Sequence, residues 1–167
     1  MFIDLAGFAM FIPLLNYIVA ELGGTILTVG LLITAFSLAQ FVCLPAWGRL
    51  SDRIGRRPVI MLGLGGAAVA YAVFGLADPA LGLSDDNRLL LGVLFLSRIM
   101  LGVMSANYAA AYAYVADVTP PEERAQGMGM LGVAFGLGFV CGPALGGLLG
   151  QWGFWLPAFF GSGLALL

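Results

Sequence analysis

Long apolar stretches alternate with short polar ones along the whole chain. A helix needs roughly 20 apolar residues to cross a bilayer, and five stretches come up to that length. A sixth begins near Phe154 and runs to the last residue. The six stretches cover residues 2–20, 28–47, 58–77, 89–116, 126–149 and 154–167. This pattern predicts an all-α polytopic membrane bundle with five complete transmembrane helices and a truncated sixth.

The polar breaks between these stretches carry most of the charge, and the arginines favour one side. Four of the seven cationic residues lie in the second break, within residues 48–57, and Arg124 lies in the fourth. These two breaks share one side because each helix reverses the direction of the chain. Cytoplasmic loops are enriched in Lys and Arg. We therefore expect this side, and the N-terminus, to be cytoplasmic, most simply in a bacterial inner membrane.

The composition also indicates lipid as the solvent. Hydrophobic residues make up 61% of the chain and charged residues 10%, with a mean hydropathy of +1.02. Soluble domains average about 25% charged residues. A net charge of -2 with no Lys and no His argues against a nucleic-acid partner, and only Cys43 and Cys141 could offer thiol ligands to a metal. No nucleophile elbow or phosphate-binding loop is present, so we expect no enzyme activity, no metal and no cofactor.

The segment Gly48–Pro58 reads GRLSDRIGRRP. Its two glycines, Gly48 and Gly55, permit a tight reversal of the chain. Asp52 lies among four guanidinium groups and can form charge-assisted hydrogen bonds with them, or cap the N-terminus of another helix. A positive-inside turn would explain the arginines alone, but not this spacing. The candidate residues of the segment are Gly48, Asp52, Arg53, Gly55, Arg56 and Arg57.

Arg98 lies about ten residues into the fourth stretch, where an unpaired charge is costly and is a functional hypothesis by default. At 100° per residue, small and polar residues of the following turns share its face of the helix. Such a stripe is typical of a cavity wall, and its candidate substrate contacts are Gly102, Ser105 and Tyr112. A structural ion pair, for example with Asp4, is the alternative.

Glycines recur every four residues in the fifth stretch and form one flat face, along which another helix can approach closely. Pro143 has no N–H to donate to the carbonyl of Phe139, so we expect a bend there. An ordinary packing seam is the alternative interpretation. The full pattern, G-x8-G-x3-G-P-x2-G-G, consists of Gly129, Gly138, Gly142, Pro143, Gly146 and Gly147.

Two carboxylates complete the candidate residues. Asp4 lies in the first turns of the first stretch and is the one carboxylate of the sequence near a helix interior. An acid at the membrane surface is the alternative interpretation for it. Asp117 lies in the fourth break with Arg124, on the same predicted side as Gly48–Pro58. The basic segment and Asp117 can therefore meet.

These motifs resemble those of the major facilitator superfamily. Gly48–Pro58 matches the family's loop G-x-L-x-D-R-x-G-R-R-P, and Arg98–Gly102 matches the Arg-x-x-x-Gly core of its fourth-helix motif. The pattern from Gly129 to Gly147 resembles the antiporter motif of its proton-driven exporters. The chain thus resembles the N-terminal six-helix half of a multidrug or tetracycline-type exporter, without the C-terminal half. Such transporters have two six-helix halves built from inverted repeats, with the substrate between them.

The resemblance implies proton-coupled antiport by alternating access. The two halves would rock about a small amphipathic substrate, and the basic segment with Asp117 would latch the cytoplasmic side. The resemblance implies that Asp117 pairs with Arg53 or Arg57, and that Arg98 takes part in proton coupling with Asp4 as the acid. The implied partners are protons, a small molecule, the lipid bilayer and the missing C-terminal half, with no cofactor.

Two alternatives remain open. A sugar or metabolite symporter, or a facilitator, of the same superfamily shares the basic segment, but importers generally lack the glycine pattern of the fifth stretch. A non-transporting half-length membrane protein, such as an assembly partner, is the second alternative. The coding region downstream of Leu167 distinguishes the second alternative from a fragment of a transporter.

Overall fold

The computed structural model describes the backbone of residues 2–166 and the side chains of residues 6–166. This part of the chain is helical and contains no strand, as predicted. Four segments within it are long and apolar enough to cross a membrane, namely 26–54, 56–75, 87–118 and 124–152, and residues 6–21 form a shorter apolar helix. The elements are α1 (Phe2–Glu21), α2 (Ile26–Ile54), α3 (Arg56–Gly75), η1 (Pro79–Leu81), α4 (Asn87–Ser105), α5 (Tyr108–Val118), α6 (Arg124–Leu149), η2 (Gly150–Trp152) and α7 (Trp155–Ala165).

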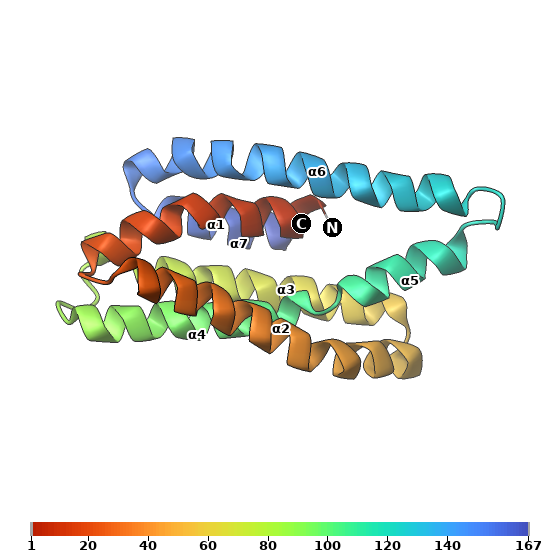
Figure 1. Cartoon of the computed structure of the whole chain (residues 1–167), viewed down its shortest axis with the longest axis horizontal. Coiled ribbons are helices and arrows are strands. Elements are labelled where there is room, and N and C mark those ends of the chain that lie inside the picture. The colour runs from red at the N-terminus through yellow and green to blue at the C-terminus, as the bar shows by residue number, and fades with distance from the viewer. Residues whose placement is uncertain (1, 167) are drawn as a thin grey trace.

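The helices pack in two layers along a common axis. Figure 1 shows α1, α6 and α7 in one layer and α2, α3, α4 and α5 in the other. Helix α1 packs along α6, α2 packs along α4, and α3 contacts both α4 and α7. The α2–α3 turn and the α5–α6 loop lie at one end of the bundle, which we call the basic end (Figure 1). The α1–α2, α3–α4 and α6–α7 connections lie at the opposite end.

Helix α2 continues well beyond its predicted end at residue 47. It runs to Ile54, so most of the basic segment is helical and only Gly55 separates α2 from α3. Gly55 has φ 96° and ψ 160°, and its N–H donates to the Ser51 carbonyl at 3.1 Å. A positive φ of this kind is accessible to glycine at little cost. The predicted turn at Gly55 is confirmed, whereas Gly48 lies inside the helix and makes no reversal.

The fourth predicted helix, 89–116, is two helices in the structure. Helix α4 ends at Ser105 and α5 begins at Tyr108, with Asn107 buried in the turn between them. The indole Nε1 of Trp47 donates to the Val103 carbonyl at 2.6 Å, and Gln40 Nε2 donates to the Ser105 carbonyl at 3.5 Å. Backbone carbonyls in an apolar environment must find donors. Two side chains of α2 therefore supply donors to carbonyls at the end of α4.

Helix α6 lies directly against the backbone of α1. A Cβ on Gly142 would come within 2.8 Å of the Ala6 carbonyl oxygen, and a Cβ on Gly146 would clash with the carbonyl oxygen of Met10. Gly138, on the same face, is also buried. The predicted flat glycine face is thus the α1–α6 contact. Gly129 and Gly147, in contrast, have nothing within 4 Å of such a Cβ and take no part in it.

Pro143 does not interrupt α6. Helix α6 continues through Pro143 to Leu149, and Figure 1 shows no sharp kink along it. Gly142 and Gly146, one on either side of Pro143, both lie against the backbone of α1.

Asp78 joins α3 to α7 at the opposite end of the bundle. Its side chain is 2% exposed. Oδ1 accepts from the Ala80 N–H at 2.8 Å and Oδ2 accepts from the Trp155 N–H at 2.7 Å. A carboxylate at the first N–H groups of a helix is favoured by hydrogen bonding and by the helix dipole. The sequence pattern places Asp78 in an outer loop and gives no sign of this tie.

Candidate functional site

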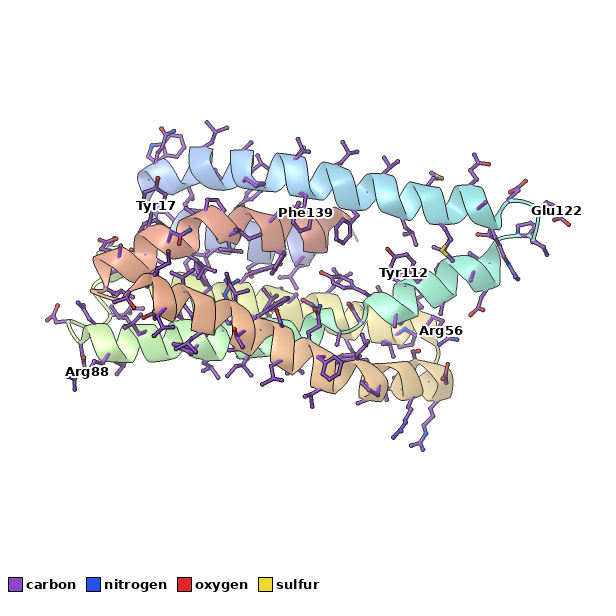
Figure 2. All side chains as sticks on the ribbon, viewed as in Figure 1. Tyr17, Arg56, Arg88, Tyr112, Glu122 and Phe139 are labelled. Carbon is purple, nitrogen blue, oxygen red and sulfur yellow. The ribbon has the colours of Figure 1, made fainter. Side chains whose placement is uncertain are left out.

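Arg56 is the centre of the charged cluster at the basic end (Figure 2). Its Nη1 donates to Asp52 Oδ1 at 2.6 Å and to Ser51 Oγ at 2.7 Å, and its Nε donates to Asp117 Oδ2 at 3.3 Å. The side chain of Arg56 is 28% exposed, against 66% for Asp52 and 60% for Asp117. One guanidinium therefore connects the end of α2, the start of α3 and the end of α5.

The helix dipoles explain why this pair forms. Arg56 is the first residue of α3, where the dipole disfavours a cation, and Asp117 lies in the last turn of α5, where it disfavours an anion. Pairing the two charges offsets both penalties. An arginine side chain keeps its charge in proteins, so the cation of this pair is permanent.

The prediction that Asp117 pairs with Arg53 or Arg57 is wrong, because Asp117 pairs with Arg56 in the structure. Arg53 shares an outer face of α2 with Ala46, Arg49 and Leu50. Arg57 is exposed. Because Gly55 ends α2 and α3 starts at the next residue, Arg56 is the arginine that faces α5. Charge alone did not distinguish the three.

Two other predicted gate residues have local roles. Arg124 Nε donates to the Thr119 carbonyl at 3.4 Å, which closes the α5–α6 loop on itself. The carbonyl of Gly48 accepts from Ser51 Oγ at 2.9 Å. Ser51 is 2% exposed, and its hydroxyl oxygen also accepts the hydrogen bond from Arg56 Nη1. Sequence reasoning missed Ser51, although its position next to Asp52 in the motif was an available signal.

Arg98 is buried in the core, at 2% exposure. Its guanidinium carbon lies 4.6 Å from the ring centroid of Phe74 and 5.3 Å from that of Phe11. These distances are typical of cation–π contacts. Among the described residues, Arg98 Nε has no hydrogen-bond partner. Its predicted partner in proton coupling, Asp4, has its side chain outside the described residues.

Gly102 and Ser105 are both buried on α4. Gly102 is buried, and a Cβ on it would clash with the carbonyl oxygen of Phe36, so this glycine allows α4 to approach the backbone of α2. Ser105 is 4% exposed at the last position of α4. Tyr112 lies beyond the break, on α5, and is 40% exposed. The predicted stripe assumes one continuous helix, and the break at Asn107 ends that register.

A cavity of about 280 Å³ opens nearby between α1, α2, α5 and α6. Its rings include two stacked pairs, Phe8 with Phe36 at 4.8 Å between centroids and Phe135 with Phe139 at 5.1 Å. Figure 2 shows Phe139 on the side of α6 that faces the other layer. We call this the aromatic cavity, and its lining residues are Phe8, Phe36, Gln40, Tyr108, Phe135 and Phe139.

A much smaller cavity, of about 20 Å³, lies beside Arg98 and shares Phe8 and Phe36 with the aromatic cavity. The two phenylalanines therefore border both spaces. Sequence reasoning missed the aromatic cavity because single phenylalanines in an apolar stretch look like lipid-facing residues. Gln40 was the available signal, since an amide inside an apolar stretch needs a partner.

Comparison with known proteins gives consistent relatives. The chain is 36% identical to the class E tetracycline resistance protein of Escherichia coli over 172 residues, covering 99% of this chain and 40% of that protein. It is 34% identical to multidrug resistance protein 2 of Bacillus subtilis over 169 residues, covering 99% and 39%. The chain thus spans about two fifths of the length of these relatives.

A solved structure agrees with this match. The crystal structure of the human organic anion transporter MFSD10 superimposes with a TM-score of 0.75 at 30% sequence identity, over 98% of this chain and 42% of that one. The sequence model of the Major Facilitator Superfamily matches residues 1–167. The sequence motifs and the helical bundle agree with both comparisons. The chain is therefore a multi-pass membrane protein that belongs to the Major Facilitator Superfamily, a family of transporters rather than enzymes.

Proposed function

We propose that this chain is the N-terminal half of a proton-coupled antiporter that exports drugs or other small amphipathic molecules by alternating access. The burial of Arg98 is the observation that carries the proposal. A charge at this depth is costly and is rarely retained in a membrane protein without a function. At 2% exposure, over the rings of Phe11 and Phe74, Arg98 is held as a fixed positive charge beside the cavities of the bundle. The relatives named for tetracycline and multidrug resistance support export as the direction of transport.

Arg98 supplies the electrostatic part of the coupling. A fixed cation favours the ionised form of a nearby carboxylate and therefore helps it release a proton. Asp4 is the proposed carboxylate. The transporter alternates between a state open to the cytoplasm and a state open to the other side. Binding of a proton shifts the equilibrium between these two states only if the carboxylate binds the proton more tightly in one of them. The small cavity beside Arg98 is lined by Arg98 and apolar side chains, so it keeps the guanidinium in an environment of low dielectric constant, where its effect on a carboxylate is stronger.

The cluster around Arg56 is the proposed latch of the cytoplasmic side. It connects α2, α3 and α5 at the basic end through exposed ion pairs, which cost little to break. Exposed pairs are therefore suited to a contact that forms in one state and opens in the other. The proposed arrangement places the N-terminus and the basic end in the cytoplasm of a bacterial cell. The partners are protons, a small molecule, the bilayer and a C-terminal half, and no cofactor is needed.

An efflux assay tests the proposal. The gene that encodes this chain is expressed in a drug-sensitive host, and retention of a fluorescent drug is measured with and without an uncoupler. We expect efflux that stops when the uncoupler collapses the proton gradient. Drug retention equal to that of an empty vector, or efflux that persists at full rate with the uncoupler, would contradict proton-driven export.

Arg98→Ala separates coupling from transport. Loss of the fixed charge removes the electrostatic bias on the carboxylate, so the variant should no longer pump against a gradient while still allowing downhill exchange. Arg98→Lys should restore only part of the activity, because an ammonium lacks the planar guanidinium that lies over the two rings. Arg88→Ala, which removes an exposed arginine at the opposite end, is the matched control. Full gradient-driven efflux in Arg98→Ala would remove Arg98 from the mechanism.

A further inference from the structure

Tyr71 is a fully buried tyrosine on α3 that lies next to the aromatic contacts of Arg98. Its ring stacks on Phe11 with 5.0 Å between the centroids and an interplanar angle of 23°. Phe74, one turn further along α3, has its centroid 4.5 Å from that of the same Phe11 ring. Phe11 and Phe74 are the two rings that contact the guanidinium of Arg98. Tyr71 therefore belongs to the group of side chains that fixes the position of this charge.

The hydroxyl of Tyr71 lies against the backbone of α1. A Cβ on Gly7 would come within 2.6 Å of Tyr71 Oη and within 2.9 Å of Tyr71 Cζ, which is closer than real Cβ atoms approach. The lack of a side chain at Gly7 therefore leaves the space that the phenol occupies. On α7, a Cβ on Gly161 would lie 3.7 Å from Tyr71 Cδ2. The ring of Tyr71 is thus held between two helices, with its oxygen directed at α1.

The register of α1 relates this contact to the proposed coupling acid. Residues three and seven positions apart lie on one face of a helix. Asp4, Gly7 and Phe11 have this spacing within α1, and Tyr71 lies against Gly7 and Phe11. Asp4 is the next position of the same face towards the N-terminus. The hydroxyl of Tyr71 therefore lies one turn of α1 from Asp4.

Few ionisable residues surround Tyr71. On α4 the residue is Arg98, which interacts electrostatically with Tyr71. Helix α7 has no ionisable side chain in residues 155–165. In α1 and α3 the other ionisable residues lie towards the ends of the helices, at Tyr17, Glu21, Arg56 and Arg57. The ionisable groups of this part of the bundle are thus a cation, a phenol and, in the proposed mechanism, the carboxylate of Asp4.

We propose that Tyr71 is a further residue of the proton site, and that its hydroxyl donates a hydrogen bond to the carboxylate of Asp4 when this carboxylate is ionised. The role of Tyr71 rests on the proposed function for the identity of the acid. A hydrogen bond donated to a carboxylate favours its ionised form, and a nearby cation acts in the same direction. Tyr71 and Arg98 together therefore favour release of the proton. The hydrogen bond also provides the partner that a buried tyrosine hydroxyl needs.

A titration of the acid tests this hydrogen bond without any transport. The whole chain is placed in nanodiscs, and infrared difference spectra follow the C=O stretch of protonated carboxylic acids as the pH is changed. The band that Asp4→Asn removes belongs to Asp4. Tyr71→Phe keeps the ring and removes the oxygen, so the midpoint of this band should move to higher pH by about one unit, a tenfold change in proton affinity. An unchanged midpoint, or a spectrum that Asp4→Asn does not alter, would overturn the proposal.

Two further variants separate the hydroxyl from packing. Gly7→Ala leaves Tyr71 in the chain but fills the space of its hydroxyl, and should move the midpoint in the same direction. This variant carries the test if Tyr71→Phe does not fold. Tyr17→Phe is the matched control, because it removes the hydroxyl of a tyrosine that is 68% exposed near the other end of α1, and it should leave the midpoint unchanged. An equal shift in Tyr17→Phe would overturn the assignment to Tyr71.

Efflux measurements distinguish this role from the proposed function. A shifted midpoint in a chain that does not export supports the hydrogen bond and removes its part in transport. Proton-driven efflux together with an unshifted midpoint in Tyr71→Phe overturns the hydrogen bond and leaves the proposed function intact. In an exporting chain, the pH dependence of efflux by Tyr71→Phe should move to higher pH with the midpoint of the acid. An efflux rate lowered equally at every pH would indicate a purely structural role for Tyr71 and overturn the proposal.

Discussion

At the scale of single residues, Arg56 and Arg57 are neighbours of the same type with different contacts and exposure. Arg56 pairs with Asp117 and Asp52, whereas Arg57, its neighbour, has no carboxylate partner among the described residues. We expect Arg56→Ala to lose most of its proton-driven efflux at unchanged abundance in the membrane, because the link between the α2–α3 turn and α5 is removed. Arg57→Ala is the control and should retain most of the activity. The measurement is the efflux rate, normalised to the amount of protein by immunoblot. A greater loss of efflux in Arg57→Ala than in Arg56→Ala would indicate that Arg57, and not Arg56, forms the latch.

The identity of these residues was predictable, but their pairing was not. The basic segment singled out Asp52 and Arg56 by type and spacing, and Asp117 was singled out as an acid in a break on the same predicted side. The partner of Asp117 depends instead on the angle at which α3 leaves Gly55, and that angle is a tertiary property. Asp78 was missed for a related reason. Asp78 caps the short helix η1 locally, but only the arrival of α7, 77 positions later, makes it a link between distant helices.

At the scale of helices, the glycine face of α6 sets the distance to α1. Gly146→Val would push a side chain into the Met10 carbonyl, and a backbone atom cannot move aside as a side chain can. We expect a loss of about 1–3 kcal/mol in stability, the usual cost of overpacking. Gly147→Val makes the same change where nothing lies within 4 Å and should cost less than about 0.5 kcal/mol. Thermal unfolding in detergent compares the two, and equal melting temperatures would argue against the close α1–α6 contact.

The helices could be predicted where residues close in the sequence determine them, and could not where distant residues do. Apolar length and a four-residue glycine period are local signals, and the spans and the α6 face were found from them. The break in the fourth span was missed because neither glycine nor proline marks it. It is stabilised by donors from Trp47 and Gln40, more than 50 positions earlier in the chain, and by Asn107, whose Nδ2 donates to the Ile60 carbonyl at 3.4 Å. Such distant partners leave no trace in a local pattern.

At the scale of the whole molecule, the two ends of the bundle are tied in different ways. Asp78 joins α3 to α7 through a carboxylate that is 2% exposed and accepts two backbone N–H groups. Arg56 joins its neighbours at the basic end through carboxylates that are 60% or more exposed. Breaking the first tie would leave a buried charge without its donors, whereas water can replace the second. The tie at the basic end is therefore the one that costs less to break.

The side of the membrane that the basic end faces is open to direct measurement. Five arginines lie at that end and Arg88 at the other, so the positive-inside rule places the basic end in the cytoplasm. With Cys43 and Cys141 replaced by alanine, single cysteines at the exposed positions Glu122→Cys and Asp85→Cys report on the two ends. We expect a membrane-impermeant maleimide to label Asp85→Cys in intact cells and Glu122→Cys only after permeabilisation. The opposite pattern would place the Arg56 cluster outside the cell. A latch that opens towards the cytoplasm, and with it the proposed direction of export, would then be untenable.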